Sequence, residues 1–250
     1  MKYIRFSRNG VPCWAVVEGE RVRTLSRPPY EGLFYDGGQE KLADCELLAP
    51  CEPTKIVCLG KNYYEHALEM NEGIPEQPIL FVKTPNTVNH PEGEITAPEF
   101  VHRLDYEGEL AFVIRKRAKN VKEKDFANYI LGYTCLNDVT ARDIQKGDGQ
   151  WYRGKSMDGF APVGPMVTDE VDPADLLVET RLNEKTVQSG RTSQFMTSIP
   201  QMLAYITASV TLEPGDVVST GTPAGIGPMK PGDVVEVEVE GIGVLRSYVV

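Results

Sequence analysis

The sequence contains few residues of the kinds that form crosslinks or bind soft metal ions. Its five cysteines lie at positions 13, 45, 51, 58 and 135, and no two of them form a Cys-x-x-Cys pair. An odd count without that spacing indicates neither a disulfide framework nor a thiolate zinc site, so we expect free and mostly buried thiols. Histidine is scarcer still, because only His66, His90 and His102 occur. Any imidazole chemistry therefore has three candidates.

Basic charge and long apolar runs are also lacking. Lysine and arginine number 26 against 36 aspartates and glutamates, which gives a net charge of −10. Phosphate binding needs clustered cations, and the one short basic run, at 115–119, predicts a solvated strand end, so we expect no nucleic-acid partner. Charges, glycines or prolines interrupt every apolar stretch well before the roughly 18 residues of a membrane span, and residues 1–10 lack the apolar core of a signal peptide. We expect a soluble cytoplasmic protein without a membrane partner.

What is present predicts a strand-rich α+β fold in two parts. Residues 1–6 and 14–22 predict two strands joined at an Asn-Gly turn, and a proline-containing linker then separates a small N-terminal β domain, 1–52, from a larger domain, 53–250. In the larger domain, β-favouring residues predict strands, and one segment predicts a helix at 195–208. The predicted strands lie at 79–82, 110–114, 129–136, 217–220 and 234–239. The sequence Pro-Gly-Asp-Val-Val occurs at 214 and again at 231, a turn before a strand each time, which favours a β meander or roll over βαβ alternation.

Three carboxylates in the larger domain form a candidate metal site. Alternation along a strand puts Glu107 and Glu109 on one face, with their Cα atoms roughly 6.5 Å apart. The next two residues on that face are apolar, which indicates an inward face, with a solvated strand end as the alternative. Two inward carboxylates repel each other and lose hydration, a combination that a cation relieves. Asp138 follows the next predicted strand, where it could instead cap a short helix at 139–145; three oxygen ligands favour magnesium or manganese over zinc.

Two shorter patterns predict groups that act on a bound substrate. His66 and Glu69 lie three residues apart in a predicted helix, so the carboxylate can orient the imidazole as a general base, and a surface pair is the alternative. Residues 219–227 leave a strand for a glycine-rich loop. Its backbone N–H groups and the Thr222 hydroxyl could grip a carboxylate, or the loop could be a plain turn.

Residues 149–156 satisfy the letters of a nucleotide-binding P-loop, but their context argues against one. A P-loop follows a buried strand and opens a helix. Here the preceding residues 142–148 are polar, the loop contains Trp, Tyr and Arg, and Gly159 and Pro162 interrupt any helix. Lys155 remains a candidate cation in a turn, with a surface lysine as the alternative.

In their order along the chain these segments resemble the fumarylacetoacetate hydrolase superfamily, over roughly residues 55–245. The segments that carry the resemblance are Gly60-Lys61-Asn62-Tyr63 with His66 and Glu69, Phe81-Val82-Lys83, Asp105-Tyr106-Glu107-Gly108-Glu109, Asn137-Asp138-Val139-Thr140-Ala141-Arg142-Asp143, Gly154-Lys155-Ser156, Asp158-Gly159-Phe160-Ala161-Pro162 and Gly221-Thr222-Pro223. The resemblance implies a mixed β-roll with few helices, preceded by the small leading domain of bacterial-type members. It also implies a homodimer.

The resemblance further implies a role for each matching residue. Magnesium or manganese would be bound by Glu107, Glu109 and Asp138. His66 and Glu69 would form a catalytic dyad on a mobile lid. Lys155 would balance developing negative charge, and the substrate would contact Thr222 and, as in some members, Arg142 and Gln145.

The implied substrate is a small 2-oxo acid, and the implied reaction is hydrolysis of an acylpyruvate or fumarylpyruvate with release of pyruvate. The metal would chelate the C1 carboxylate and the 2-oxo group and stabilise the pyruvate enolate. The same enolate chemistry without water gives decarboxylation of oxaloacetate, and with proton relocation it gives isomerisation of 2-hydroxyhepta-2,4-diene-1,7-dioate in aromatic catabolism, so the resemblance does not choose among them. A nucleotide-binding enzyme and a non-catalytic metal-bearing relative are remote alternatives.

Overall fold

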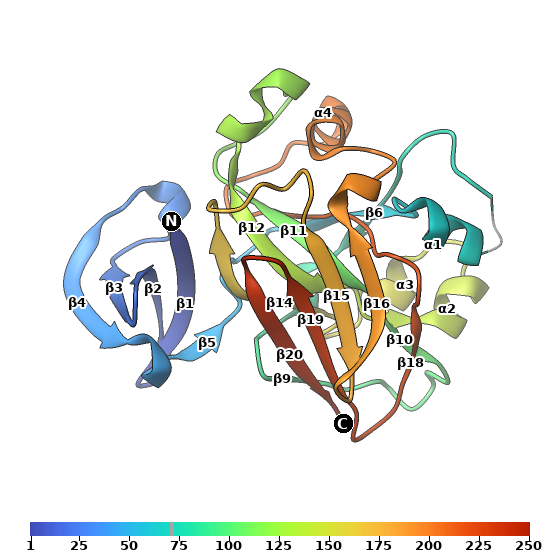
Figure 1. The fold of residues 1–250 in the computed structure, drawn as a ribbon, viewed down its shortest axis with the longest axis horizontal. Helices are drawn as coiled ribbons and strands as arrows, with labels where there is room; N and C mark the ends of the chain where they lie inside the picture. Colours follow the sequence, from blue (N-terminus) through green and yellow to red (C-terminus); the bar gives the residue numbers. More distant parts are fainter. Residues whose placement is uncertain (71–72) are drawn as a thin grey trace.

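The computed structural model describes residues 1–70 and 73–250, where β-strands dominate and helices are short (Figure 1). The largest sheet contains β1 (Lys2–Arg8), β2 (Val11–Glu18), β3 (Arg21–Leu25), β4 (Tyr35–Lys41), β5 (Glu46–Leu48), β6 (Ile56–Gly60), β7 (Ile79–Lys83), β8 (Val88–Asn89), β11 (Gly108–Ile114), β12 (Ile130–Asn137), β14 (Ala161–Thr168) and β17 (Val217–Ser219). Its strand order is β4-β3-β2-β1-β14-β12-β11-β17-β6-β7, with β5 beside β1 and β8 beside β14.

Two smaller sheets and four short α-helices complete the fold of the described residues. One sheet has the order β13 (Thr140–Ala141), β10 (Leu104–Tyr106), β18 (Gly227–Met229). The other has the order β16 (Lys185–Arg191), β15 (Leu177–Leu182), β19 (Val234–Val239), β20 (Gly243–Val249), β9 (Gly93–Ile95). The helices are α1 (Tyr64–Glu69), α2 (Arg142–Gly147), α3 (Tyr152–Lys155) and α4 (Ile199–Ser209). No helix of the described residues combines the length and the apolar character that a bilayer crossing requires.

The structure confirms the predicted strand-rich fold. Each of the five strands predicted in the larger domain is present within two residues of its predicted bounds. Most pairings are antiparallel, while β17 pairs with β6, β14 with β8 and β20 with β9 in parallel, so the two larger sheets are mixed. The strands of residues 1–48 extend the largest sheet, because β1 pairs with β14 through Lys2 opposite Thr168 and Tyr3 opposite Val167.

Three element predictions were wrong in detail. The strand predicted at 14–22 is split into β2 and β3, because Gly19 adopts φ +62° and turns the chain back. The helix predicted from residue 195 begins at Ile199, where Ser198 and Gln201 form a capping box. The helix predicted at 139–145 begins at Arg142, and its N-cap is Ala141 rather than Asp138.

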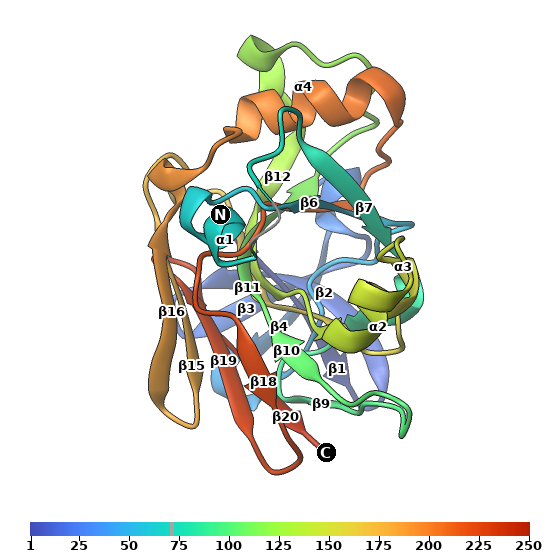
Figure 2. The same ribbon diagram turned by 90° about the vertical axis from the view of Figure 1, so that its right-hand side faces the viewer.

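Strand β11 is the buried centre of the fold. Leu110, Phe112 and Ile114 pack on one face of the strand, in a cluster that includes residues of α4. Ala111 and Val113 pack on the other face with residues of β1 and β2. Burial on both faces holds the strand rigidly, so the residues at its beginning have fixed positions. Figure 2 shows α1 on one side of this strand and the α2–α3 pair on the other.

Candidate active site

Three carboxylates meet where β11 begins and β12 ends. Glu107 lies in the break between β10 and β11, and its N–H donates to the Asn137 side chain at 3.0 Å, so it is not part of the single strand that the alternation predicted. Glu109 is the second residue of β11, and the Asp138 N–H donates to the Glu107 carbonyl at 2.8 Å. One carboxylate oxygen from each of Glu107, Glu109 and Asp138 lies within 4.8 Å of the others, and all three residues are buried.

Buried cations neutralise part of this triad. The Lys155 Nζ donates to Glu107 Oε2 at 2.7 Å and to Asp138 Oδ2 at 2.6 Å, and Arg142 donates to the other Glu107 oxygen. Burial alone would raise the pKa of Glu107, but the charges of Lys155 and Arg142 outweigh it and hold that pKa well below its usual range. Burial likewise opposes the charge of Lys155, yet Asp138 and Glu107 raise its pKa. Glu107 and Lys155 are therefore both charged at neutral pH.

Glu109 has a different environment. Its carboxylate accepts hydrogen bonds from neutral donors, the Ser219 hydroxyl and the Gly221 N–H, the latter at 2.8 Å. Burial, reinforced by the charges of Asp138 and Glu107, raises its pKa well above the ordinary value. Three buried carboxylates converge here, and the hydrogen bonds to Glu109 come from neutral groups rather than cations. Such a set of oxygen donors is suited to a hard divalent cation. The triad can therefore bind a divalent metal ion through Glu107, Glu109 and Asp138.

The predicted dyad lies on α1, which covers the triad. His66 is 5% exposed, and its Nδ1 lies 3.2 Å from Glu69 Oε2. Glu69 in turn accepts a hydrogen bond from the Gly225 N–H at 3.2 Å. This contact connects α1 to the glycine-rich loop 220–227, and His66 is buried while Glu69 reaches the surface. A carboxylate bonded to Nδ1 leaves Nε2 of the imidazole for a substrate.

Backbone N–H groups of the glycine-rich loop bind carboxylates, as predicted, but these carboxylates belong to the protein itself and not to a substrate. The Gly221 N–H binds Glu109 and the Gly225 N–H binds Glu69. Thr222 lines the pocket, but its hydroxyl donates to the Gly108 carbonyl at 2.9 Å and accepts from the Gln188 amide at 2.8 Å. The loop therefore positions the triad and the dyad, and the Thr222 hydroxyl is already engaged within the protein.

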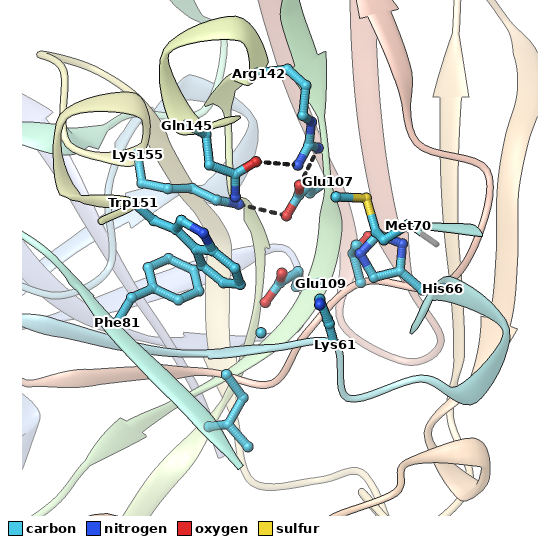
Figure 3. Close-up of a pocket in the computed structure, with 13 residues that line it drawn as sticks. Lys61, His66, Met70, Phe81, Glu107, Glu109, Arg142, Gln145, Trp151 and Lys155 are labelled. Carbon is cyan, nitrogen blue, oxygen red and sulfur yellow. Dashed lines mark hydrogen bonds and ion pairs between the residues drawn. The ribbon is translucent and has the colours of Figure 1, made fainter. Parts of the chain in front are cut away.

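One small pocket, shown in Figure 3, is lined by seven of the nine predicted site residues; the other two, Glu69 and Asp138, are bonded to His66 and Lys155 of its lining. It is lined by Leu59, Gly60, Lys61, His66, Met70, Phe81, Glu107, Glu109, Arg142, Gln145, Trp151, Lys155 and Thr222. Arg142 and Gln145 lie side by side, joined by a hydrogen bond of 2.7 Å between guanidinium and amide oxygen. The volume of the pocket, about 20 Å³, accommodates roughly one water molecule, so the pocket must widen before a substrate can enter.

Several residues in the pocket or bonded to the triad were not predicted from the sequence. The Lys83 side chain is fully buried, and its Nζ donates to Asp138 Oδ1 at 2.6 Å, while Lys155 donates to the other oxygen of that carboxylate. Phe81 and Trp151 form an aromatic wall, with their ring centroids 5.3 Å apart. Lys83 and Phe81 lie in a segment that the resemblance had already marked. Trp151 lies in the P-loop look-alike, where α3 has four residues and Lys155 binds carboxylates, so that segment does not open a phosphate-binding helix.

Fold and site together define a strand-rich protein with a buried carboxylate triad beneath a histidine–glutamate pair. Comparison with known proteins identifies the family of this protein. The family profile described as fumarylacetoacetate (FAA) hydrolase C-terminal matches residues 55–250, and one described as Rv2993c-like, N-terminal matches residues 1–50. The chain therefore belongs to the fumarylacetoacetate hydrolase family of enzymes.

Individual relatives cover most of the chain. An uncharacterised protein of Archaeoglobus fulgidus is 49% identical over 88% of this chain and 88% of its own length. The oxaloacetate tautomerase YisK of Bacillus subtilis is 40% identical over 83% of this chain and 74% of its own length. A crystal structure described as 5-carboxymethyl-2-hydroxymuconate delta-isomerase from Mycobacterium smegmatis is 37% identical and superposes with a TM-score of 0.94, over 100% of this chain and 99% of that one.

Proposed function

We propose that this protein is a divalent-metal-dependent enzyme that moves a proton at C3 of a small 2-oxo acid, as a keto–enol tautomerase or isomerase. The observation that carries the proposal is the position of His66, bonded to Glu69, in the same pocket as Glu107 and Glu109, the two triad carboxylates that line it. A general base beside a site that stabilises an enolate is sufficient for enolisation. The names of the Bacillus subtilis and Mycobacterium smegmatis relatives, a tautomerase and an isomerase, support this choice.

The chain's own residues supply the proton transfer. Magnesium or manganese held by Glu107, Glu109 and Asp138 would supply the positive charge that stabilises the enolate oxygen. His66 would take the C3 proton at Nε2, because Nδ1 faces Glu69. The Glu69 carboxylate would stabilise the imidazolium until the proton is delivered to the C2 oxygen in a tautomerisation, or to a different carbon of the substrate in an isomerisation. Because the Gly225 N–H holds Glu69, α1 must be closed for the dyad to be aligned.

Hydrolysis of an acylpyruvate, the reaction that the resemblance favoured, stays a prediction. It requires the same enolate stabilisation and, in addition, a water molecule beside the distal carbonyl of the substrate. Decarboxylation of oxaloacetate requires the enolate but no base at C3. All three reactions therefore use the triad to stabilise an enolate, and they differ in the role of His66.

One experiment separates them. Metal-loaded protein is given oxaloacetate, acetylpyruvate and fumarylpyruvate; the enol absorbance reports tautomerisation, and pyruvate release reports cleavage. We expect accelerated keto–enol interconversion that is abolished by chelation and inhibited competitively by oxalate, a planar mimic of the enolate. Full turnover after exhaustive chelation would falsify the metal dependence, and pyruvate release without tautomerisation would favour cleavage. The predicted homodimer is checked by light scattering on the same samples.

A further inference from the structure

Asp105 is a fully buried carboxylate that lies outside the candidate metal triad and does not line the pocket. It lies on β10, opposite Thr140 of β13. The Arg142 N–H then donates to the Arg103 carbonyl at 2.8 Å, so this pairing brings the first residue of α2 beside Asp105. A buried charge is costly unless it is bonded to groups of opposite charge, so the partners of this carboxylate indicate what it does.

One of these partners is Arg142, whose guanidinium is bonded on three sides. Its Nε donates to Asp105 Oδ2 at 2.8 Å, its Nη1 donates to the Gln145 amide oxygen at 2.7 Å, and its Nη2 donates to Glu107. The side chain is 3% exposed and lines the pocket, where Figure 3 shows it between Gln145 and Glu107. Each terminal nitrogen carries a second hydrogen, so the guanidinium can also donate to a bound anion.

The bond from Asp105 differs from the other two in its relation to the triad. Glu107 is a candidate metal ligand, so a bound cation would share the carboxylate that holds Nη2. Gln145 carries no charge. Asp105 lies outside the triad, so its charge-assisted bond to Nε would hold the guanidinium in the same way with or without the metal.

A second arginine provides an internal comparison. The Arg103 Nε and Nη2 donate to the oxygens of the same Asp105 carboxylate at 2.9 and 3.1 Å. The Arg103 side chain is 48% exposed and does not line the pocket. The two arginines therefore make the same kind of bond to one carboxylate, and Arg142 is the one that can reach a substrate.

We propose that Asp105 is a positioning residue that fixes the Arg142 guanidinium in the orientation in which it binds the anionic substrate. The inference rests on the proposed function, because it takes a 2-oxo acid as the ligand of Arg142. It adds a residue that acts through Arg142 without touching the substrate. Loss of the Asp105 charge would leave Arg142 in the pocket with its Nε side unheld, so substrate binding would weaken while His66 and the triad remain.

A double-mutant cycle tests this role. The variants are Asp105→Asn, Arg142→Met and the combination of the two, with Arg103→Met as the matched control. Arg142→Met leaves Asp105 bonded to Arg103 and Glu107 bonded to Lys155, so neither carboxylate loses all its cationic partners. KM and kcat for oxaloacetate tautomerisation are measured at a saturating magnesium concentration, determined separately for each variant.

We expect Asp105→Asn to raise KM about 10- to 30-fold with kcat within about threefold. In the Arg142→Met protein the same substitution should change KM by less than about twofold, because the group that it positions is gone. Arg103→Met should leave KM within about threefold of wild type. An unchanged KM in Asp105→Asn, or the same fold-increase in both backgrounds, would overturn the proposal, since a purely structural role does not depend on Arg142.

A second background covers the case in which Asp105→Asn alone does not fold. The cycle is then measured in Arg103→Met protein, where loss of the Asp105 charge leaves one cation without its partner instead of two. The same dependence on Arg142 is expected there, and its absence would overturn the role of Asp105.

Calorimetry with oxalate on magnesium-loaded protein distinguishes this failure from failure of the proposed function. If wild-type protein interconverts no 2-oxo acid, the proposed reaction is wrong. A loss of oxalate affinity of about tenfold in Asp105→Asn, absent when Arg142 is already Met, would still support the positioning role. Unchanged affinity, equal losses in both backgrounds, or failure of the wild-type protein to bind oxalate would overturn it whatever the reaction.

Discussion

Binding of the metal ion should release a proton from Glu109. In the metal-free protein burial and the charges of Asp138 and Glu107 raise the pKa of Glu109 well above its ordinary value of 4.5, and its hydrogen bonds come from Ser219 and Gly221. A metal ligand must be the carboxylate, so the ion displaces the proton. Below the raised pKa the release approaches one proton per ion, and above it the release falls to zero.

The same linkage sets the size of the effect on affinity and stability. Below the raised pKa, each decrease of one pH unit should weaken metal binding about tenfold, or about 1.4 kcal/mol, because protonation of Glu109 competes with the ion. In the metal-free protein the protonated Glu109 is favoured, so the free energy of unfolding falls as pH rises from 4.5 through the raised pKa. Glu107 affects the free energy of unfolding in a different pH range. Its pKa is lowered, so the stabilisation that it contributes is present above pH 4.5 and is lost as the pH falls below that value.

Isothermal titration calorimetry with magnesium, in two buffers of different ionisation enthalpy, measures the released protons directly. Glu109→Gln is the control, because it keeps the shape of the side chain and cannot titrate. It should bind magnesium weakly and release no proton from this position. A binding heat that is independent of buffer, together with an affinity that is independent of pH while the protein stays folded, would refute the reasoning. Proton release that persists in Glu109→Gln would assign the proton to another group.

Three further predictions follow from the site and the sheet that carries it. His66→Ala should lower the tautomerisation rate by about 10² to 10⁴ and leave magnesium affinity unchanged; a parallel loss of affinity would contradict its assignment as base. Asp216→Asn should lower the free energy of unfolding by about 3–5 kcal/mol in urea titrations, because the buried carboxylate accepts bonds from residues 54 and 55, including the Lys55 ammonium. Gly60→Ala should displace Trp151, whose ring would lie 2.5 Å from the new Cβ, with a shift in tryptophan fluorescence; an unchanged spectrum would refute it.

Local patterns in the sequence determined which residues could form the site. Alternation placed the apolar residues of β11 on two opposite faces, and both faces are buried as that pattern requires. Helical spacing placed His66 and Glu69 within contact distance, because a helix brings residues three apart onto one side. Asp138 follows a predicted strand, where it could also have been a helix N-cap, and it became informative only beside the other two carboxylates. These features depend on a few neighbouring residues, so a single sequence is enough to find them.

Tertiary structure decided how the triad is neutralised. Lys155 lies 48 residues from Glu107, and Lys83 lies 55 residues from Asp138, so no local pattern shows that these amines meet the carboxylates. The Gly221 N–H binds Glu109 across 112 residues, because the pairing of β17 with β11 brings the loop to that carboxylate. Strand register, set by packing over the whole sheet, fixes these distances. The candidate ligands can thus be identified from the sequence, while the partners that set their charge are brought together only when distant strands pair.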